Sequence, residues 1–438
     1  MSDVQMTEKA MKSMYSRPHC LATQTDEIFI KLSVTCPNID VYGPMAYYSK
    51  MKTSWHELIS GNLDILIEAA QSAVPDDVQT ISRLRKKGSL EQVSTVLELL
   101  EARRRARGRL SRPDEWWIDR EGAEQATRSI VAEHKSRRVR EVSGEQPIID
   151  LCCGIGSDAL ALSKRGPVIL VDHDPMKLLL ASANLRRFSE NKSHDSHLVI
   201  RAKAENLPLA PLPIHIDPAR RSGTQRMHAY TEMQPGPAVI ESIIEHHRDV
   251  ALKCGPGVSA DDLPAGEIEW IQDGPDLVEA TLWCGQFDGG KRRRATLVKT
   301  GLSVSGNPIP LEEETQKTPQ FLHEPVPVLE RSGLTGHLQA DLAAGELHPG
   351  LGWLAGQDHK TSPWFRSFEV VDRLGWHEKK VIDWFKARGE APRAIKTRGV
   401  KEDPAALGRK FPRKKGDWTL ALLRRGTKIE AWILQELK

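Results

Sequence analysis

The sequence predicts an α/β protein built on a doubly wound sheet, with a helical region before it and a small α+β module after it. Three observations indicate this fold class. Short β-rich runs alternate with helical runs between residues 144 and 300, a glycine-containing turn follows the first of these strands, and the pattern changes on either side. The length of 438 residues suits two or three domains, and a content of 39% hydrophobic residues is enough for a substantial core.

Residues 1–50 differ from the rest of the chain. They show no sustained periodicity, and six of the nine methionines fall between Met1 and Met51. We expect residues 1–50 to be a poorly ordered extension, or part of an over-long gene product whose real start is Met51.

Residues 51–143 are expected to form a helical domain. Apolar residues recur there at spacings of three and four, namely Leu90, Val93, Val96, Leu97 and Leu100. Ser89 with Gln92 three positions later has the form of a capping box. An arginine-rich run, 103–109, follows at the end of this helix, and it is typical either of a solvated helix end or of a surface that faces nucleic acid.

Residues 144–300 predict the sheet itself. Strands are expected at 147–152, 168–172, 197–201, 214–217 and 250–254, with helices at 157–165 and 175–188. Strands that alternate with helices indicate a parallel sheet. The later β-rich segments at 267–272, 277–283 and 294–298 lack long helices between them, so we expect a terminal antiparallel hairpin on the sheet.

The remaining residues predict a linker and a further module. Five prolines lie within 308–327, which indicates a linker and small connecting module over residues 301–365. Beyond it, residues 366–438 suit a small α+β domain, with strands at 368–374, 393–398, 418–423 and 429–434 and helices at 377–388 and 404–410.

The most informative stretch is PIIDLCCGIGSDA, residues 147–159. An apolar strand ends at Asp150, turns through Gly154 and Gly156 and enters a helix, so that backbone N–H groups and a helix N-terminus can approach a ligand closely. The next strand ends at Asp172, where a carboxylate can accept hydrogen bonds from both hydroxyls of an adenosine ribose. A dinucleotide and S-adenosylmethionine both fit this pattern.

The stretch IHIDPARR, residues 214–221, indicates which of these two ligands the site binds. A strand that ends in Asp-Pro places the carboxylate of Asp217 at the carboxyl edge of the sheet, where ligands of open α/β sheets bind. A methyltransferase needs such a group, because the acceptor nucleophile must lie in line with the sulfonium methyl and often loses a proton. A hydride-transfer enzyme does not need it, so the sequence favours methyl transfer.

Seven separated motifs occur in order: GAEQATR (122–128), DLCCGIGSDAL (150–160), VDHDP (171–175), IDPARR (216–221), VEATLW (278–283), RRATLV (293–298) and KTRGV (396–400). In these motifs the chain resembles the class I S-adenosylmethionine-dependent methyltransferases, and more narrowly the bacterial group with a helical N-terminal region and a THUMP-like C-terminal domain. The resemblance covers residues 52–438. It implies a Rossmann-like methyltransferase domain over residues 144–300, with S-adenosylmethionine as its cofactor.

The expected site residues follow from these motifs. The cofactor is expected to contact Asp150, Cys152, Gly154, Gly156, Asp158, Asp172 and Glu205. Cys152 stands where most class I enzymes have a third glycine, and Glu205 is the nearby carboxylate because Ala202 and Lys203 replace a Gly-Asp pair. Asp217 and Arg220 are the expected catalytic residues, and Arg220 and Arg221 are expected to contact either a substrate phosphate or the cofactor carboxylate. Lys253 is expected to contact substrate or its phosphate, with a surface lysine as the open alternative.

Cys254, at the end of the fifth strand, has two interpretations. A thiolate there would suit the covalent adduct that methylation of a pyrimidine carbon requires, but a small buried strand-end residue is the favoured interpretation.

Several other classes of site and location find no support in the sequence. The six cysteines are scattered without a C-x-x-C spacing, and the histidines form no i, i+4 pair that flanks a glutamate. No apolar run approaches the roughly 20 residues needed to cross a bilayer. We expect a cytoplasmic protein that needs no metal, and the sequence assigns no oligomeric state.

The net charge of +3 hides an uneven distribution. Residues 376–428 contain 16 Lys and Arg against 6 Asp and Glu, a net charge of +10, which leaves −7 for the rest of the chain. Arg393, Lys396 and Arg398 of this segment are expected to contact RNA phosphates. Its tryptophans are expected to belong to the core.

The leading hypothesis is a methyltransferase that transfers the methyl group of S-adenosylmethionine to a nucleophile in RNA, either tRNA or rRNA. One alternative is a methyltransferase that acts on protein or on a small molecule. A second is a non-catalytic RNA-binding protein that keeps a vestigial methyltransferase fold.

Overall fold

The computed structural model describes residues 40–42, 53–71, 78–164, 166–188, 197–207, 211–220, 230–314 and 318–437. The chain divides into two compact units. The first consists of Met1–Cys254, Asp261–Pro264 and Trp283–Phe287, and the second of Gly255–Ala260, Ala265–Leu282 and Asp288–Lys438. This division differs from the five parts expected from the sequence, because the helical region packs with the parallel strands in one unit and the division between the units falls near Cys254, not near residue 300.

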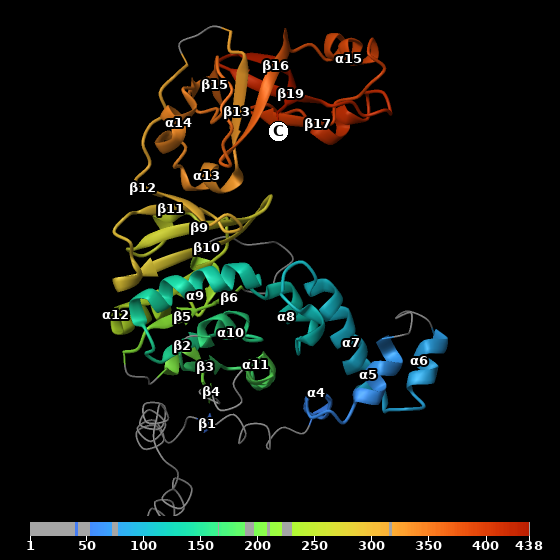
Figure 1. Ribbon diagram of the computed structural model, residues 1–438, viewed down its shortest axis with the longest axis vertical. Helices are drawn as coiled ribbons and strands as arrows, with labels where there is room; N and C mark the ends of the chain where they lie inside the picture. The colour runs from blue at the N-terminus through green and yellow to red at the C-terminus, as the bar shows by residue number, and fades with distance from the viewer. Residues whose placement is uncertain are drawn as a thin grey trace, which may run out of the picture. The chain divides into compact units, whose positions relative to one another are not determined.

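The helical region of the first unit begins at residue 53 (Figure 1). It contains α4 (Ser54–Ile59), α5 (Asp64–Gln71), α6 (Val78–Leu84), α7 (Leu90–Ala106), α8 (Arg120–Gln125) and α9 (Ser129–Ser143). The predicted capping box of α7 is confirmed, since Ser89 and Gln92 exchange hydrogen bonds of 3.2 and 2.8 Å. The buried face of α7 includes Val93 and Val96, but Leu90 is 63% exposed, so the apolar stripe starts later than predicted.

The arginine run at the end of α7 makes contacts within the first unit. Arg103 is buried and its Nε donates to the backbone oxygen of Trp116 at 2.9 Å. Arg105 forms ion pairs with Glu101 at 2.9 Å and with Glu124 at 3.1 Å. These contacts favour the helix-end interpretation of the run over a surface that faces nucleic acid.

The parallel sheet of the first unit agrees with the sequence prediction. Its strands are β2 (Ile148–Leu151), β3 (Val168–Asp172), β4 (His197–Arg201), β5 (Ile214–Ile216) and β8 (Val250–Cys254), and its helices are α10 (Ser157–Ser163), α11 (Pro175–Phe188) and α12 (Pro237–His247). The strand order is β4-β3-β2-β5-β8, and all neighbours in it are parallel. The order reverses direction between β2 and β5, so the carboxyl ends of these two strands form the topological switch point, where open α/β sheets bind ligands.

Three residues of the expected N-terminal extension belong to this sheet. Asp40–Tyr42 form β1, which pairs antiparallel with β4. Strand pairing depends on backbone groups, so a three-residue edge strand leaves no periodicity in the sequence. The rest of residues 1–50 lie outside the described residues.

The second unit contains the strands expected as a terminal hairpin. They are β9 (Glu267–Asp273), β10 (Asp276–Cys284) and β11 (Arg293–Leu297), and β12 (Leu302–Gly306) follows. The order is β10-β9-β11-β12, in which β11 is parallel to β9 and antiparallel to β12. The expected simple hairpin is therefore wrong for β11. β11 does not pair with β10, the strand before it in the chain, but with the other edge of β9.

The segment expected as a linker and small connecting module, residues 301–365, is largely structured. Beyond β12 it contains β13 (Phe321–Pro325), α13 (Pro327–Ser332), α14 (Gly336–Leu342), β14 (Gly345–Glu346) and β15 (Leu354–Gly356). Pro327 occupies the first turn of α13, where a missing N–H costs nothing. β13, β14 and β15 belong to the same sheet as the C-terminal strands, so prolines here mark the start of an element and not only a linker.

The C-terminal module agrees closely with the sequence prediction (Figure 1). It contains β16 (Phe365–Gly375), α15 (Glu378–Lys386), β17 (Ala394–Arg398), α16 (Pro404–Gly408), β18 (Trp418–Arg425) and β19 (Lys428–Glu436). The seven-stranded sheet has the order β14-β15-β13-β16-β19-β18-β17. One face of β18 and β19 packs on α15 and α16, which buries Phe385 and Leu407 in a core with Leu420 and Ile433.

Candidate functional site

The turn between β2 and α10 carries the backbone that the sequence predicts to approach a ligand. Gly154 and Gly156 have φ angles of +53° and +82°, a conformation that favours glycine. A Cβ atom on Gly156 would lie 3.1 Å from the Cα of Ala181 in α11, whereas one on Gly154 would meet nothing within 4 Å. Gly156 therefore allows α11 to pack against the turn, and Gly154 leaves open space beside it.

Cys152 occupies the same turn in a conformation that is unusual for its residue type. Its φ angle is +59°, which explains why a glycine is common at this position in the class I enzymes that the chain resembles. Burial, followed by the charges of Asp172 and Asp217, raises the pKa of the Cys152 thiol well above its usual value. The thiol is therefore a poor nucleophile.

Asp172 lies at the end of β3 and contacts this turn. Its Oδ2 accepts a hydrogen bond from the N–H of Gly154 at 3.1 Å, and its Oδ1 accepts one from the N–H of Asp174 at 2.9 Å. Burial raises the pKa of Asp172. Asp174 accepts a hydrogen bond from the N–H of Met176 at 2.7 Å, as a residue that caps the N-terminus of a helix does.

Glu205 is a further predicted cofactor residue at this edge. It lies in the short 3-10 helix Ala204–Asn206 that follows β4, and its side chain is exposed. Its charge is among those that raise the pKa of Cys152. The structure thus places the glycine turn, Asp172 and Glu205 after three neighbouring parallel strands.

Asp150 is buried in β2 beside a histidine that the sequence prediction did not include. Its Oδ1 lies 2.7 Å from Nδ1 of His215 in β5, and burial raises the pKa of Asp150. Within the part of the chain that the structure describes, Oδ2 of Asp150 has no hydrogen-bond partner.

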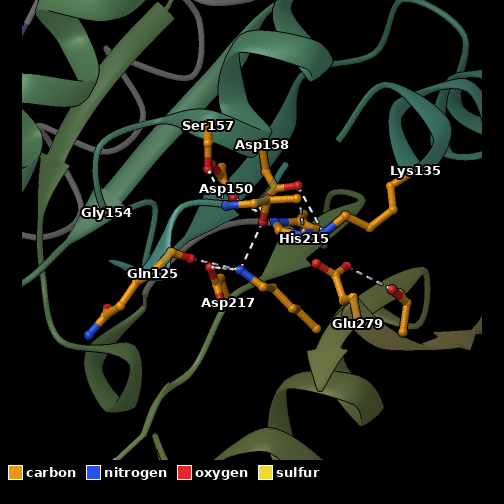
Figure 2. A network of polar contacts seen from close by, with 12 residues as sticks. Gln125, Lys135, Asp150, Gly154, Ser157, Asp158, His215, Asp217 and Glu279 are labelled. Carbon is orange, nitrogen blue, oxygen red and sulfur yellow. Dashed lines mark hydrogen bonds and ion pairs between the residues drawn. The ribbon is translucent and has the colours of Figure 1, made fainter. Parts of the chain in front are cut away.

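Asp158 is part of the same buried network, which Figure 2 shows. Its Oδ1 forms an ion pair of 2.9 Å with Lys135 of α9, and its Oδ2 accepts a hydrogen bond of 2.5 Å from the hydroxyl of Thr127. Burial is the largest single influence and would raise the pKa of Asp158, but the charges of Lys135, His215 and Lys253 and the hydrogen bond from Thr127 together outweigh it, so the pKa is lowered. Nζ of Lys135 also lies 3.2 Å from Nε2 of His215, so Asp158 faces buried protein groups.

Asp217 and Lys253, predicted separately, lie in direct contact. Asp217 follows β5, and its Oδ2 lies 2.7 Å from Nζ of Lys253 in β8. Lys253 also donates to the hydroxyl of Thr127 at 2.8 Å. The side chain of Asp217 is 29% exposed and that of Lys253 only 13%, so the carboxylate is the more accessible partner.

The two arginines after Asp217 differ in how far the structure describes them. Arg220 belongs to β6 (Ala219–Arg220), whose backbone pairs with β7 (Met233–Gln234). Arg221 lies outside the described residues.

Three residues of the network were missed by the sequence prediction: Thr127, Lys135 and His215. Thr127 lies in the GAEQATR motif and His215 in IHIDPARR, so both stood in stretches already singled out. Lys135 is one of several bases in the stretch that forms α9, and no local pattern distinguishes it.

Cys254 is buried, as the favoured interpretation expects. Its Sγ donates to the backbone oxygen of Leu252 at 3.6 Å. This placement does not favour the covalent role considered for it.

The predicted RNA-binding residues lie on and beside β17 in the second unit. Lys396 forms hydrogen bonds of 2.6 and 2.9 Å with the carboxylate of Glu324, and Arg398 makes two contacts of 2.6 and 2.7 Å with Glu330. The side chain of Arg393 is exposed. The charges of Lys396 and Arg398 are thus balanced by nearby carboxylates.

An aromatic pair lies beside Arg393. Trp384 and Trp418 pack edge to face with ring centroids 5.9 Å apart, and the guanidinium of Arg388 lies 3.5 Å from the centroid of the Trp384 ring. The N–H of Arg393 donates to the oxygen of Trp418 at 2.7 Å. Both rings pack against the core but are only half-buried, so the expectation that these tryptophans belong to the core holds in part.

The described residues contain no group of three or more His, Cys, Asp or Glu arranged to hold a metal ion. No helix among them is both long and apolar enough to span a membrane.

The geometry of the switch point fits S-adenosylmethionine. The open space beside Gly154 leaves room for a ligand at the turn. Each oxygen of a carboxylate has two lone pairs, so Asp172 keeps the capacity to accept from ribose hydroxyls after its two backbone hydrogen bonds.

Comparisons with known proteins agree with this fold. Residues 365–436 match the THUMP domain-like family. Two Mycobacterium tuberculosis proteins, from strains CDC 1551 and H37Rv and both described as uncharacterised S-adenosylmethionine-dependent methyltransferases, are 29% identical over 342 residues, which is 75% of this chain and 91% of each relative. A crystal structure of a candidate methyltransferase from Porphyromonas gingivalis W83 has a TM-score of 0.71 with 17% identity, and the match covers 86% of this chain and 99% of that one.

Proposed function

We propose that this chain, which is a class I S-adenosylmethionine-dependent methyltransferase with a THUMP-like C-terminal domain, transfers its methyl group to RNA. The observation that carries the choice of RNA is the C-terminal domain. The THUMP domain-like match spans residues 365–436, and residues 376–428 within it have a net charge of +10. A strongly basic small domain suits the phosphate contacts that dominate nucleic-acid affinity.

The RNA contact is proposed at Arg393 and the neighbouring aromatic pair. Arg393 is exposed for a phosphate contact, and the half-buried rings of Trp384 and Trp418 offer surfaces on which a base can stack. Lys396 and Arg398 of β17 already pair with Glu324 and Glu330, so we propose that they contribute less to phosphate binding than Arg393 does.

The catalytic roles follow from the switch point. When bound, S-adenosylmethionine supplies a sulfonium methyl group for direct transfer. The turn from Cys152 to Gly156 and the carboxylate of Asp172 would hold this cofactor, with Glu205 on its adenosine side. Asp217 would accept a hydrogen bond from the acceptor atom, align it and take up its proton, because a positioned base and in-line alignment are what this reaction needs. Arg220 and Arg221 would contact an acceptor phosphate.

The acceptor atom is proposed to be a nitrogen or oxygen that carries a hydrogen. A carboxylate only accepts hydrogen bonds, so Asp217 matches an N–H or O–H donor. Methylation of a pyrimidine carbon instead needs a thiolate. Burial is the main cause that raises the pKa of the Cys152 thiol, so little of it is thiolate. Cys254 is buried, so neither thiol favours methylation of a carbon.

The substrate class is tested by labelled methyl transfer. Total RNA and total protein from a deletion strain are incubated with the purified chain and labelled S-adenosylmethionine, and the labelled nucleosides are identified by mass spectrometry. Label in an N- or O-methylated nucleoside supports the proposal. Label in protein alone would identify a protein methyltransferase and would contradict it.

The role of Asp217 is tested by Asp217→Ala. We expect a loss of methyl transfer of about 10²- to 10⁴-fold, the range typical for a positioned base. Calorimetric binding of S-adenosylmethionine should stay within a few-fold of the unchanged protein, because Asp217 follows β5 and not the glycine turn. Full activity in this variant would remove Asp217 from the mechanism.

A further inference from the structure

Lys253 is surrounded by oxygen atoms of its own unit. Its Nζ lies 2.7 Å from Oδ2 of Asp217, 2.8 Å from the hydroxyl of Thr127 and 3.5 Å from the backbone oxygen of Gln125. Only 13% of its side chain is exposed. An ammonium group has three N–H donors, and these protein oxygens already engage the ammonium of Lys253. A substrate phosphate would have to displace these contacts.

Thr127 connects this lysine to the buried network. Its hydroxyl donates to Oδ2 of Asp158 at 2.5 Å, so its oxygen lone pairs are left for Lys253. Its N–H donates to the hydroxyl of Ser157, and Thr127 is only 3% exposed. Asp158 is in turn paired with Lys135 at 2.9 Å. One chain of polar contacts therefore runs from Lys135 through Asp158 and Thr127 to Lys253 and Asp217. Figure 2 labels Lys135, Asp158 and Asp217 of this chain.

From this arrangement we infer that Lys253 and Thr127 are positioning residues for Asp217. The inference rests on the proposed role of Asp217 in orienting the acceptor. Lys253 holds Oδ2 of Asp217 and leaves Oδ1 for the acceptor, while Thr127 holds Lys253 in place. The end of the GAEQATR segment, residues 126–128 between α8 and α9, thus becomes part of the acceptor site, although it belongs to the helical region and carries no predicted role.

The chemistry of the step assigns each residue a task. A bond forms between the acceptor atom and the methyl carbon, the bond from that carbon to sulfur breaks, and sulfur keeps the electron pair. The proton of the acceptor leaves to Asp217. Lys253 neither receives this proton nor touches the acceptor, so its removal should slow the step without weakening substrate binding.

Two pairs of variants test this inference with RNA from the deletion strain as acceptor. Lys253→Met removes the charge at similar length and Lys253→Arg keeps it, while Thr127→Val removes the hydroxyl at similar volume and Thr127→Ser keeps it. We expect Lys253→Met to lower kcat about 100-fold and Thr127→Val about 10-fold, with KM for RNA within threefold and both conservative variants within about fivefold of the unchanged enzyme.

A phosphate-binding lysine would behave differently. In that case Lys253→Met would raise KM with kcat unchanged, and it would lower the slope of affinity against salt by about 1. Either that result or unchanged kinetics in Lys253→Met would overturn the inference. If Lys253→Met fails to fold, the Thr127→Val and Thr127→Ser pair decides, and equal kcat values in those two variants would also overturn it.

The double variant Asp217→Ala with Lys253→Met separates this inference from the proposed function. Residues that act as one unit are not additive, so the double variant should be about as slow as Asp217→Ala alone. An active Asp217→Ala variant would contradict the proposed function itself. An inactive Asp217→Ala variant together with fully additive losses would contradict only the positioning role of Lys253.

Discussion

At the scale of single residues, the charges in the first unit are placed where they compensate one another. Lys135, Asp158 and His215 are all buried, and each has a charged or polar partner within 3.2 Å. Removing one member of a buried ion pair typically costs about 3–5 kcal/mol, because the other charge stays buried without its partner. This network therefore couples the stability of the unit to the geometry at Asp217.

Cys152 leads to a prediction about backbone strain. Its φ angle of +59° costs a non-glycine residue about 1–2 kcal/mol, and a glycine would avoid this strain. A glycine also makes the unfolded chain more flexible, and this entropy offsets part of the gain. We expect Cys152→Gly to leave the free energy of unfolding unchanged or to raise it by up to about 1 kcal/mol, measured by chemical denaturation.

Cys152→Ala is the matched control, since it removes the sulfur and keeps a Cβ atom at the same φ angle. It should be less stable than Cys152→Gly. If Cys152→Ala is the more stable of the two, contacts of the Cβ atom and not the backbone conformation decide this position.

At the scale of elements, α8 packs directly on the cofactor turn. A Cβ atom on Gly122 of α8 would lie 2.5 Å from Cγ2 of Ile155 and 2.7 Å from Oδ1 of Asp119. Asn184 of α11 connects the turn to the residues just before α8, because its amide donates to the oxygens of Trp117 and Ile155, both at 2.9 Å. The helical region therefore helps to position the turn that approaches the cofactor.

Gly122→Ala tests this role of α8. The added methyl group must displace Ile155 or α8, so we expect a loss of about 1–3 kcal/mol in the free energy of unfolding together with weaker binding of S-adenosylmethionine in calorimetry. Gly236→Ala is the control, because a Cβ atom there meets nothing within 4 Å. Unchanged cofactor affinity in Gly122→Ala would show that α8 does not position the turn.

The elements of the parallel sheet could be predicted because their signals are local. Each strand is a short apolar run, and Gly154, Asp172 and Asp217 occur where strands end, so the sequence alone indicates that they share one edge. The contact of Lys253 with Thr127 joins residues 126 positions apart, and no periodicity or motif spacing reports such a pair. The parallel pairing of β11 with β9 escaped prediction for the same reason, since it depends on how a connection returns across the sheet.

At the scale of the whole molecule, charge is separated along the chain. Residues 376–428 have a net charge of +10, and the remaining residues sum to −7. Such a separation attracts a polyanion to the C-terminal domain, where its affinity should depend steeply on salt. Within that domain Lys396 and Arg398 already pair with Glu324 and Glu330, so a sequence count of charges overstates how many bases can contact phosphate.

A substitution at Arg393 in the full-length chain tests whether the C-terminal domain contacts RNA phosphates. We expect Arg393→Gln to weaken binding of bulk tRNA and to reduce the slope of log K against log salt by about 0.7–0.9, the effect of one lost phosphate contact. Lys87→Gln, which removes an exposed charge from the helical region, should leave the slope unchanged. Lys396→Gln should change the slope less than Arg393→Gln does, because its charge already pairs with Glu324. Equal slopes for Arg393→Gln and the unchanged protein would place the RNA contact elsewhere in the chain.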